Sequence, residues 1–209
     1  MSILIDSADI EEVRQAMELG WVAGVTTNPA LIAKTNRPVD QLIAAILEAS
    51  RGPVFCQLTT DAPEQQEAEA RHLHALAPDR IVLKIPAATA NLSLLARLRP
   101  ETPCALTAVY AGHQALAACE AGARYLIPYV NRATRLLGDG LKLVGELSAV
   151  AERAGTGTEI LAASIKTPEE ASEAFLAGAD HLTLPFDVIL RMGDHDLSER
   201  AIKEFRQVG

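Results

Sequence analysis

The sequence predicts an α/β fold, a single (β/α)8 TIM barrel over residues 1–209 with an extra C-terminal helix at about 196–207. Three observations support this prediction. Eight short apolar runs alternate with helix-like stretches along the chain. The average unit is about 26 residues long, which suits a compact barrel with few insertions. The competing fold, a doubly wound open sheet, is disfavoured because no G-x-G-x-x-G segment follows any run.

The predicted strands are short runs rich in aliphatic residues. The fourth run, around Lys84, is apolar on both sides of the lysine, which is typical of a parallel strand covered on both faces. Proline ends this run at Pro86. The eight runs lie at residues 3–5, 22–26, 53–58, 80–86, 104–109, 124–130, 159–164 and 180–185.

Helix-like stretches separate these runs, and some have recognisable N-terminal ends. Asn28 is a candidate N-cap before Pro29. Thr167 and Glu170 form a capping-box pattern. We expect one helix to begin at Pro29 and another to begin after Thr167. The other helices are expected at about residues 8–19, 62–76, 90–98, 112–121 and 141–153.

Composition indicates one globular unit in a reducing compartment. Hydrophobic residues make up 49% of the chain and charged residues 22%, which is ordinary for a folded domain. Cys56, Cys104 and Cys119 are odd in number and far apart, which argues against a disulfide framework. The N-terminus has no basic segment before an apolar one, and no apolar run could cross a bilayer. We therefore expect a soluble, cytoplasmic protein.

Charge and histidine spacing argue against two further classes of function. A net charge of −8 and few aromatic residues leave little basis for a nucleic-acid surface, and no membrane partner is expected. His72 and His74 are two residues apart on a predicted helix, so they cannot share a face as metal ligands. We expect neither a metal nor a cofactor.

Polar side chains lie at or near the ends of seven of the eight runs. A parallel barrel gathers the C-terminal ends of its strands on one face, so these side chains should converge there. Burial would disfavour the charged form of a lysine, lower its pKa and free the amine for attack on a carbonyl. The ordinary alternative is a lysine whose stem lines the strand while its head reaches solvent or pairs with a carboxylate. The polar residues at or near the ends of these seven runs are Asp6, Asn28, Gln57, Lys84, Thr107, Tyr129 and Ser164.

These residues lie in segments that resemble the motifs of the small transaldolase-like class I aldolases. The resemblance runs in collinear order over essentially the whole chain. The segments are Leu4-Ile-Asp-Ser-Ala-Asp9, Val25-Thr-Thr-Asn-Pro29, Val82-Leu-Lys-Ile-Pro86, Leu106-Thr-Ala-Val-Tyr110, Pro128-Tyr-Val-Asn-Arg132 and Leu161-Ala-Ala-Ser-Ile-Lys-Thr-Pro168.

The resemblance implies a Schiff-base aldolase that reversibly cleaves fructose 6-phosphate to dihydroxyacetone and glyceraldehyde 3-phosphate. Gln57 and Tyr129 are similar to the residues of such aldolases, whereas transaldolases carry glutamate and usually phenylalanine there. The alternative is a transaldolase that passes the dihydroxyacetone unit to a second sugar phosphate. A barrel that binds sugar phosphates without turnover is a third hypothesis.

The resemblance also implies roles for the catalytic residues. Lys84 would form an imine with the C2 carbonyl of a ketose, and the protonated imine would accept the electrons of the breaking C3 to C4 bond. Tyr129 would be the general acid and base, acting through a water held by Gln57 and Thr107. Because an amide cannot carry protons, a phenol is the best remaining candidate. A core aromatic with a bonded hydroxyl is the alternative for Tyr129.

Four further residues would bind the substrate by the same resemblance. Asp6, also counted as catalytic, and Asn28 would hold substrate hydroxyls, although each could instead cap a helix. Arg132 would supply the cation for a phosphate, and Ser164 a hydroxyl donor. The relatives also imply a homo-oligomer, a pentamer or decamer.

Two other positions affect this interpretation. Lys166 is a rival nucleophile, but we expect solvation or pairing with Glu169 or Glu170 to keep it charged. Ile127 stands where the resembled aldolases tend to have alanine. A branched side chain there would shrink the donor pocket, so a smaller ketone such as hydroxyacetone could fit better than dihydroxyacetone.

Overall fold

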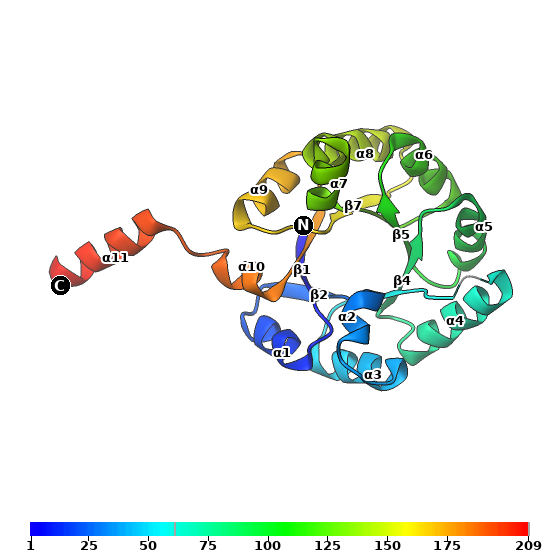
Figure 1. Ribbon diagram of the computed structural model, residues 1–209, viewed down its shortest axis with the longest axis horizontal. Coiled ribbons are helices and arrows are strands. Elements are labelled where there is room, and N and C mark those ends of the chain that lie inside the picture. The colour runs from blue at the N-terminus through cyan, green and yellow to red at the C-terminus, as the bar shows by residue number, and fades with distance from the viewer. Residues whose placement is uncertain (61, 209) are drawn as a thin grey trace.

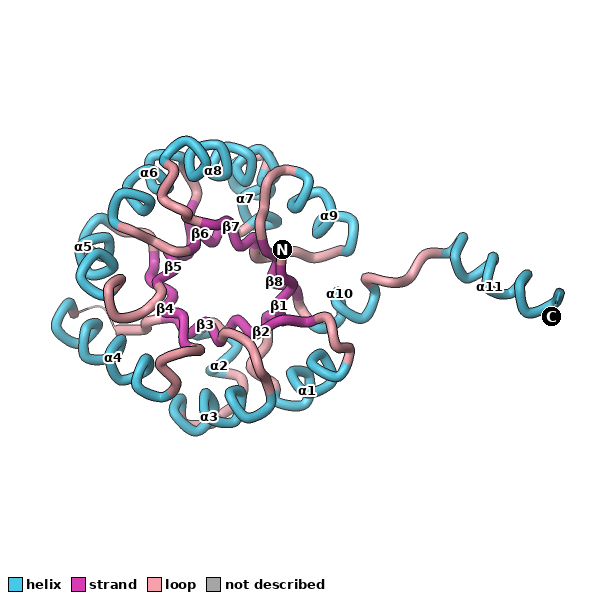
Figure 2. The backbone as a smooth tube through the Cα atoms, turned by 180° about the vertical axis from the view of Figure 1, so that it is seen from behind, coloured by secondary structure: helices cyan, strands magenta, loops and turns pink. Residues whose placement is uncertain are grey.

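Eight parallel strands close into a barrel, and helices surround it (Figures 1 and 2). The computed structural model describes residues 1–60 and 62–208. Strands pair in chain order, and β1 closes the ring against β8. The predicted (β/α)8 fold is therefore confirmed. The strands are β1 (Ser2–Asp6), β2 (Val22–Thr26), β3 (Val54–Gln57), β4 (Ile81–Pro86), β5 (Cys104–Val109), β6 (Tyr125–Pro128), β7 (Glu159–Ala162) and β8 (His181–Leu184).

The helices cover the outside of the strands, except for the last one, which stands away from the barrel in both views (Figures 1 and 2). No helix among residues 1–60 and 62–208 is both long and apolar enough to span a bilayer. The helices are α1 (Ile10–Glu18), α2 (Pro29–Ala33), α3 (Val39–Ala49), α4 (Pro63–Leu76), α5 (Thr89–Leu98), α6 (Gly112–Ala121), α7 (Val130–Leu137), α8 (Gly140–Ala154), α9 (Pro168–Leu176), α10 (Phe186–Arg191) and α11 (Asp196–Val208).

Helix α7 was not predicted, and its cause is non-local. The sixth run was expected to continue to Val130, but β6 ends at Pro128 and Val130 begins α7. The backbone N–H groups of Val130 and Asn131 donate to the carbonyls of Ala163 and Ser164, at 2.8 and 3.1 Å. These bonds satisfy two donors that every helix start leaves open. Sequence spacing near residue 130 cannot reveal acceptors that lie more than thirty residues away.

The stretch after Pro29 also differs from the prediction, because it forms two helices instead of one. Asn28 caps α2 as expected, since its side-chain oxygen accepts from the backbone of Leu31 at 3.0 Å. The chain then turns through Asn36, which has a left-handed φ of +52°, before α3 begins at Val39. Asparagine is one of the few residues that tolerates this conformation. The short α10 was likewise not predicted.

Apolar side chains fill the inside of the barrel up to the level where polar side chains begin. The inner cluster contains Leu4, Phe55, Val82, Ala105, Ile127, Leu161 and Ala163. Strand side chains return to the same face every second residue, so the residue two positions later lies above each of these, nearer the C-terminal end. For five of them that residue is a predicted site residue, namely Asp6, Gln57, Lys84, Thr107 and Tyr129.

Candidate active site

The polar side chains predicted from the sequence line one cavity at the C-terminal end of the barrel. Its volume is about 470 Å³. Seven of the eight predicted site residues line it, and the eighth, Thr107, is buried and bonds to Tyr129. The lining includes Asp6, Thr26, Asn28, Gln57, Lys84, Ile127, Tyr129, Arg132, Ser164, Lys166 and Thr183.

Lys84 is buried in the wall of this cavity. Its side chain is 4% exposed, and its Nζ donates to the backbone carbonyl of Thr27 at 2.7 Å. Burial lowers the pKa of Lys84, while the charges of Asp6 and Cys56 act in the opposite direction. The alternative in which the lysine head reaches bulk solvent is therefore wrong. A neutral amine in a cavity is what attack on a carbonyl requires.

Asp6 is held in place by a pair of threonines. Its carboxylate accepts from the Thr26 hydroxyl at 2.9 Å, and the Thr26 and Thr183 hydroxyl oxygens lie 2.6 Å apart. The N-cap of α1 is Asp9, so the helix-capping alternative for Asp6 is wrong. Sequence reasoning missed Thr26 and Thr183, although both occupy strands next to β1 and their period-two positions could have been found.

Tyr129 has a hydroxyl that is bonded but still faces the cavity. The Tyr129 hydroxyl lies 3.0 Å from that of Thr107. The guanidinium carbon of Arg132 lies 4.9 Å from the centre of the tyrosine ring, a cation–π contact. Burial raises the pKa of Tyr129, and the Thr107 bond and the Arg132 charge oppose this rise. The phenol is thus a proton donor at neutral pH.

Gln57 carries an unsatisfied acceptor. Its Oε1 is buried and accepts no hydrogen bond from any residue that the structure describes. Gln57 lies directly beside Lys84 in the register of β3 and β4. Because buried amide oxygens almost always have a donor, a water or substrate hydroxyl is expected to bond to Gln57.

Ser164, Arg132 and Lys166 form the outer, cationic edge of the cavity. Strand β7 ends at Ala162, earlier than predicted, and Ser164 follows in a left-handed conformation with φ of +60°. A non-glycine residue there is strained, and such strain often occurs at functional sites. Lys166 also lines the cavity, and its backbone N–H donates to the Glu170 carboxylate at 2.7 Å. Sequence analysis did not recognise Lys166 as part of this edge.

Ile127 forms part of the cavity floor. It is 1% exposed and belongs to the inner apolar cluster. Its branched side chain therefore occupies space at the bottom of the cavity, on the strand that leads to Tyr129 and one strand removed from β4, which carries Lys84.

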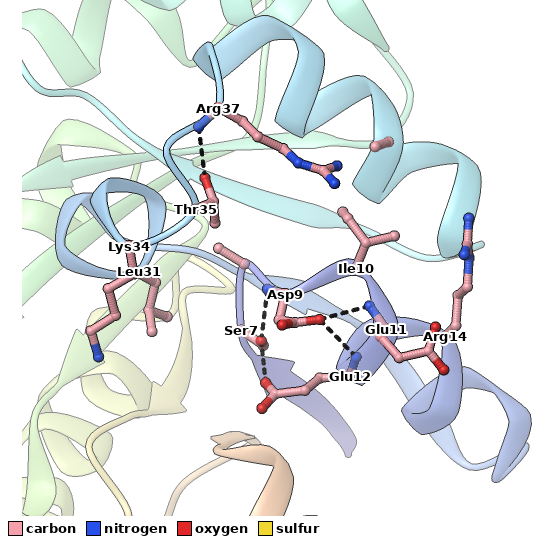
Figure 3. A pocket seen from close by; sticks show the side chains of 12 residues that line it. Ser7, Asp9, Ile10, Glu11, Glu12, Arg14, Leu31, Lys34, Thr35 and Arg37 are labelled. Atoms are coloured by element: carbon pink, nitrogen blue, oxygen red, sulfur yellow. Dashed lines mark hydrogen bonds between the residues drawn. The ribbon is translucent and has the colours of Figure 1, made fainter.

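A larger cavity of about 740 Å³ lies beside α1 and the segment after α2, as Figure 3 shows. Its acidic groups have structural partners. The Asp9 carboxylate accepts from the backbone N–H groups of Glu11 and Glu12, at 2.8 and 3.3 Å, and Ser7 donates to the Glu12 carboxylate. Ser7 is buried there, but its hydroxyl is already bonded to Glu12 and accepts from the backbone N–H of Asp9 at 3.0 Å. Lys34, which also lines this cavity, is exposed. The smaller cavity, with its buried lysine, is therefore the candidate active site. Within residues 1–60 and 62–208, no three His, Cys, Asp or Glu side chains gather as metal ligands.

The chain belongs to the family described as Transaldolase/Fructose-6-phosphate aldolase, whose model matches residues 3–208. A probable transaldolase of Heliobacterium modesticaldum is 39% identical, over 98% of this chain and 95% of that protein. A probable transaldolase of Aquifex aeolicus is 37% identical, over 98% of this chain and 94% of that protein. The family resemblance found in the sequence is thus confirmed.

Solved structures show the same architecture at low identity. A mandelate oxidase variant with an FMN adduct matches with a TM-score of 0.64 and 16% identity, over 97% of this chain and 70% of that one. At this identity the likeness shows the fold alone.

Replacing the buried amine should stabilise the protein while removing its chemistry. Between its lowered pKa and the ordinary value of 10.5, Lys84 binds fewer protons in the folded chain than in the unfolded chain, so stability rises with pH. Lys84→Met should therefore raise the free energy of unfolding at pH 7. The gain should shrink as the pH approaches 10.5.

Urea unfolding of both proteins across this pH range measures the effect, with the exposed Lys166→Met as the control. A pH-independent difference, or a gain of equal size in the control, would contradict a desolvated Lys84. We also expect Lys84→Met to lower kcat at least ~10³-fold if Lys84 is the nucleophile that the family resemblance implies.

Proposed function

We propose that this chain is a Schiff-base enzyme that breaks the C3 to C4 bond of a ketose phosphate such as fructose 6-phosphate. The burial of Lys84 among polar groups at the barrel mouth carries this proposal. Family membership adds support. An amine kept neutral in a cavity can condense with the C2 carbonyl and release water, which yields an iminium ion after protonation.

Bond cleavage then needs a base for the C4 hydroxyl and an acceptor for the bonding electrons. The iminium nitrogen accepts the electrons as C3 to C4 breaks, and the C4 hydroxyl loses its proton as the aldehyde forms. We assign the proton transfers to Tyr129, through a water held by Gln57 and Thr107. Tyr129 would donate its proton as water leaves during formation of the imine, and the resulting phenolate would then accept the proton of the C4 hydroxyl. The hydrogen bond between Tyr129 and Thr107 and the open acceptor of Gln57 support this role.

Asp6 and Asn28 would align the substrate hydroxyls. The carboxylate of Asp6 has only one oxygen bonded to Thr26, so the other can accept from a hydroxyl. The Asn28 side-chain oxygen caps α2, which leaves its amide N–H groups as donors toward the cavity.

The phosphate would lie at the outer edge of the cavity. Arg132 and Lys166 are exposed cations on that edge, and Ser164 adds a hydroxyl donor. A guanidinium and an ammonium bind phosphate oxygens strongly. The net charge of −8 makes such a local cationic site necessary for an anionic sugar.

The fate of the bound three-carbon unit separates two candidate functions. Transfer to an acceptor aldehyde, a transaldolase reaction, has the support of the relatives, which are named probable transaldolases. Release of dihydroxyacetone, an aldolase reaction, is the second candidate. It is favoured by Gln57 and Tyr129, since an amide stands where transaldolases carry a glutamate. Three buried free cysteines fit the reducing cytoplasm that we propose as the location.

Reductive trapping tests the imine directly. Borohydride added with dihydroxyacetone should leave a three-carbon adduct on Lys84, identified by peptide mass mapping. Lys84→Met should give no adduct, and Lys166→Met should still be modified at Lys84. An adduct on Lys166, or none on the unmodified protein, would show that this nucleophile is wrongly assigned.

Acceptor dependence distinguishes transfer from release. With fructose 6-phosphate alone, an aldolase should release dihydroxyacetone steadily, whereas a transaldolase should release it at least about tenfold more slowly than it transfers it to erythrose 4-phosphate. Gln57→Glu should raise the ratio of transfer to release, because a carboxylate can carry a proton where an amide cannot. An unchanged ratio would show that Gln57 does not decide the fate of this unit.

We also propose that α11 docks onto another copy of this chain in a homo-oligomer. The helix stands away from the barrel, and Leu197, Ile202 and Phe205 are 64%, 47% and 73% exposed. Replacing Ile202 and Phe205 by aspartate should reduce the mass measured by light scattering. Lys203→Ser, on the other side of the helix, should not change it. A full-length chain that is monomeric at micromolar concentration would contradict this proposal.

A further inference from the structure

Two separate segments supply the cationic edge of the cavity, and hydrogen bonds join them. Arg132 lies in the first turn of α7, whereas Ser164 and Lys166 lie between β7 and α9. The pairing of β6 with β7 is continued by a bridge between Tyr129 and Ala163, but Arg132 and Lys166 are exposed and lie beyond this bridge. Binding a rigid, compact anion requires that the separation between Arg132 and Lys166 be set before the anion arrives.

Glu170 links these two segments through its carboxylate. One of its carboxylate oxygens accepts from the backbone N–H of Lys166 at 2.7 Å. The other accepts from the side-chain amide of Asn131 at 3.3 Å. Glu170 itself is fixed at the start of α9, because its own N–H donates to the Thr167 hydroxyl at 3.1 Å.

The backbone reinforces this link. The backbone N–H of Asn131 donates to the carbonyl of Ser164 at 3.1 Å. The left-handed conformation of Ser164 directs this carbonyl toward α7. Asn131 therefore contacts the segment that carries Lys166 on both sides of that lysine. Its backbone N–H bonds to Ser164, and its side chain bonds to Glu170 at the start of α9. Arg132 is the next residue, so the position of its backbone follows that of Asn131.

We propose that Asn131 and Glu170 form a brace that sets the spacing between Arg132 and the Ser164 to Lys166 segment, and thereby determines the preference for phosphorylated substrates. Both are positioning residues. This inference rests on the proposed function only in assigning the bound anion to a sugar phosphate. The capping-box pattern predicted for Thr167 and Glu170 is present in part, but the Glu170 carboxylate reaches Lys166 and Asn131 and does not reach back to Thr167.

Four variants of the full chain test the brace. Asn131→Ala and Glu170→Ala each break the bridge. Glu170→Gln keeps an acceptor for the Lys166 N–H and a partner for Asn131, whose amide can turn over. Glu169→Ala is the matched control, since it removes the same charge from the same turn. Within the described residues, the Glu169 carboxylate makes no hydrogen bond or ion pair with Asn131 or Lys166, and hydrogen bonding within its own helix start is the main cause that lowers its pKa.

The first measurement compares kcat and KM for fructose 6-phosphate and for fructose. Breaking the bridge should lower the ratio of kcat/KM between the two sugars about tenfold, mainly through KM, the usual scale for losing a hydrogen bond to a charged group. Glu170→Gln should restore the ratio to within about twofold, and Glu169→Ala should leave it unchanged. An unchanged ratio in Asn131→Ala, or an equal fall in Glu169→Ala, would overturn the brace.

The second measurement needs no turnover. Line broadening of inorganic phosphate in ³¹P NMR should show about tenfold weaker binding to Asn131→Ala than to the unmodified chain. If Glu170→Ala fails to fold by circular dichroism, Asn131→Ala alone decides, because alanine suits its helical position. Equal phosphate binding in both proteins would overturn the brace, whereas failure to trap dihydroxyacetone on Lys84 would overturn the proposed function alone.

Discussion

The cost of taking an amine out of water is the constraint around which this barrel mouth is arranged. Desolvation of Lys84 favours its neutral form, and the carboxylate of Asp6 opposes that effect. The position of Asp6 therefore contributes to the pKa of the amine. That position depends on two hydroxyls on the neighbouring strands. Thr26 on β2 donates to the Asp6 carboxylate, and Thr183 on β8 bonds to the Thr26 hydroxyl. Neighbouring strands thus tune one functional group through a few short bonds.

The strands and most of the cavity lining could be predicted from the sequence, because both depend on local alternation. A polar residue two positions after an apolar one at a strand end, as in Val82 and Lys84, reveals which face it occupies. The remaining features depend on contacts between distant segments. Helix α7 begins where it does because of carbonyls beyond β7, and the side-chain bond between Asn131 and Glu170 joins residues that lie 39 positions apart. No spacing within one segment contains that information.

Family membership and fold carry different information about this molecule. The mandelate oxidase structure shares the barrel at 16% identity, so the scaffold alone says nothing about the reaction. In this chain a ring of polar side chains lies above the inner apolar layer, and Gln57 lies beside Lys84 in that ring. The family model matches nearly the whole chain, so family membership, unlike the fold, bears on the chemistry of this ring.

The packed inner layer also limits the routes by which small molecules can reach Lys84. Phe55, Val82 and Ile127 are buried in the inner layer beneath Lys84. Under the proposed chemistry, substrate and products would therefore enter and leave at the C-terminal end of the strands, where the cavity opens. The aldehyde that bears the phosphate would then lie nearest the opening of the cavity, and the three-carbon unit attached to Lys84 would lie deeper. The order of departure is then dictated by geometry, because the outer product has to vacate the exit before the inner one can follow.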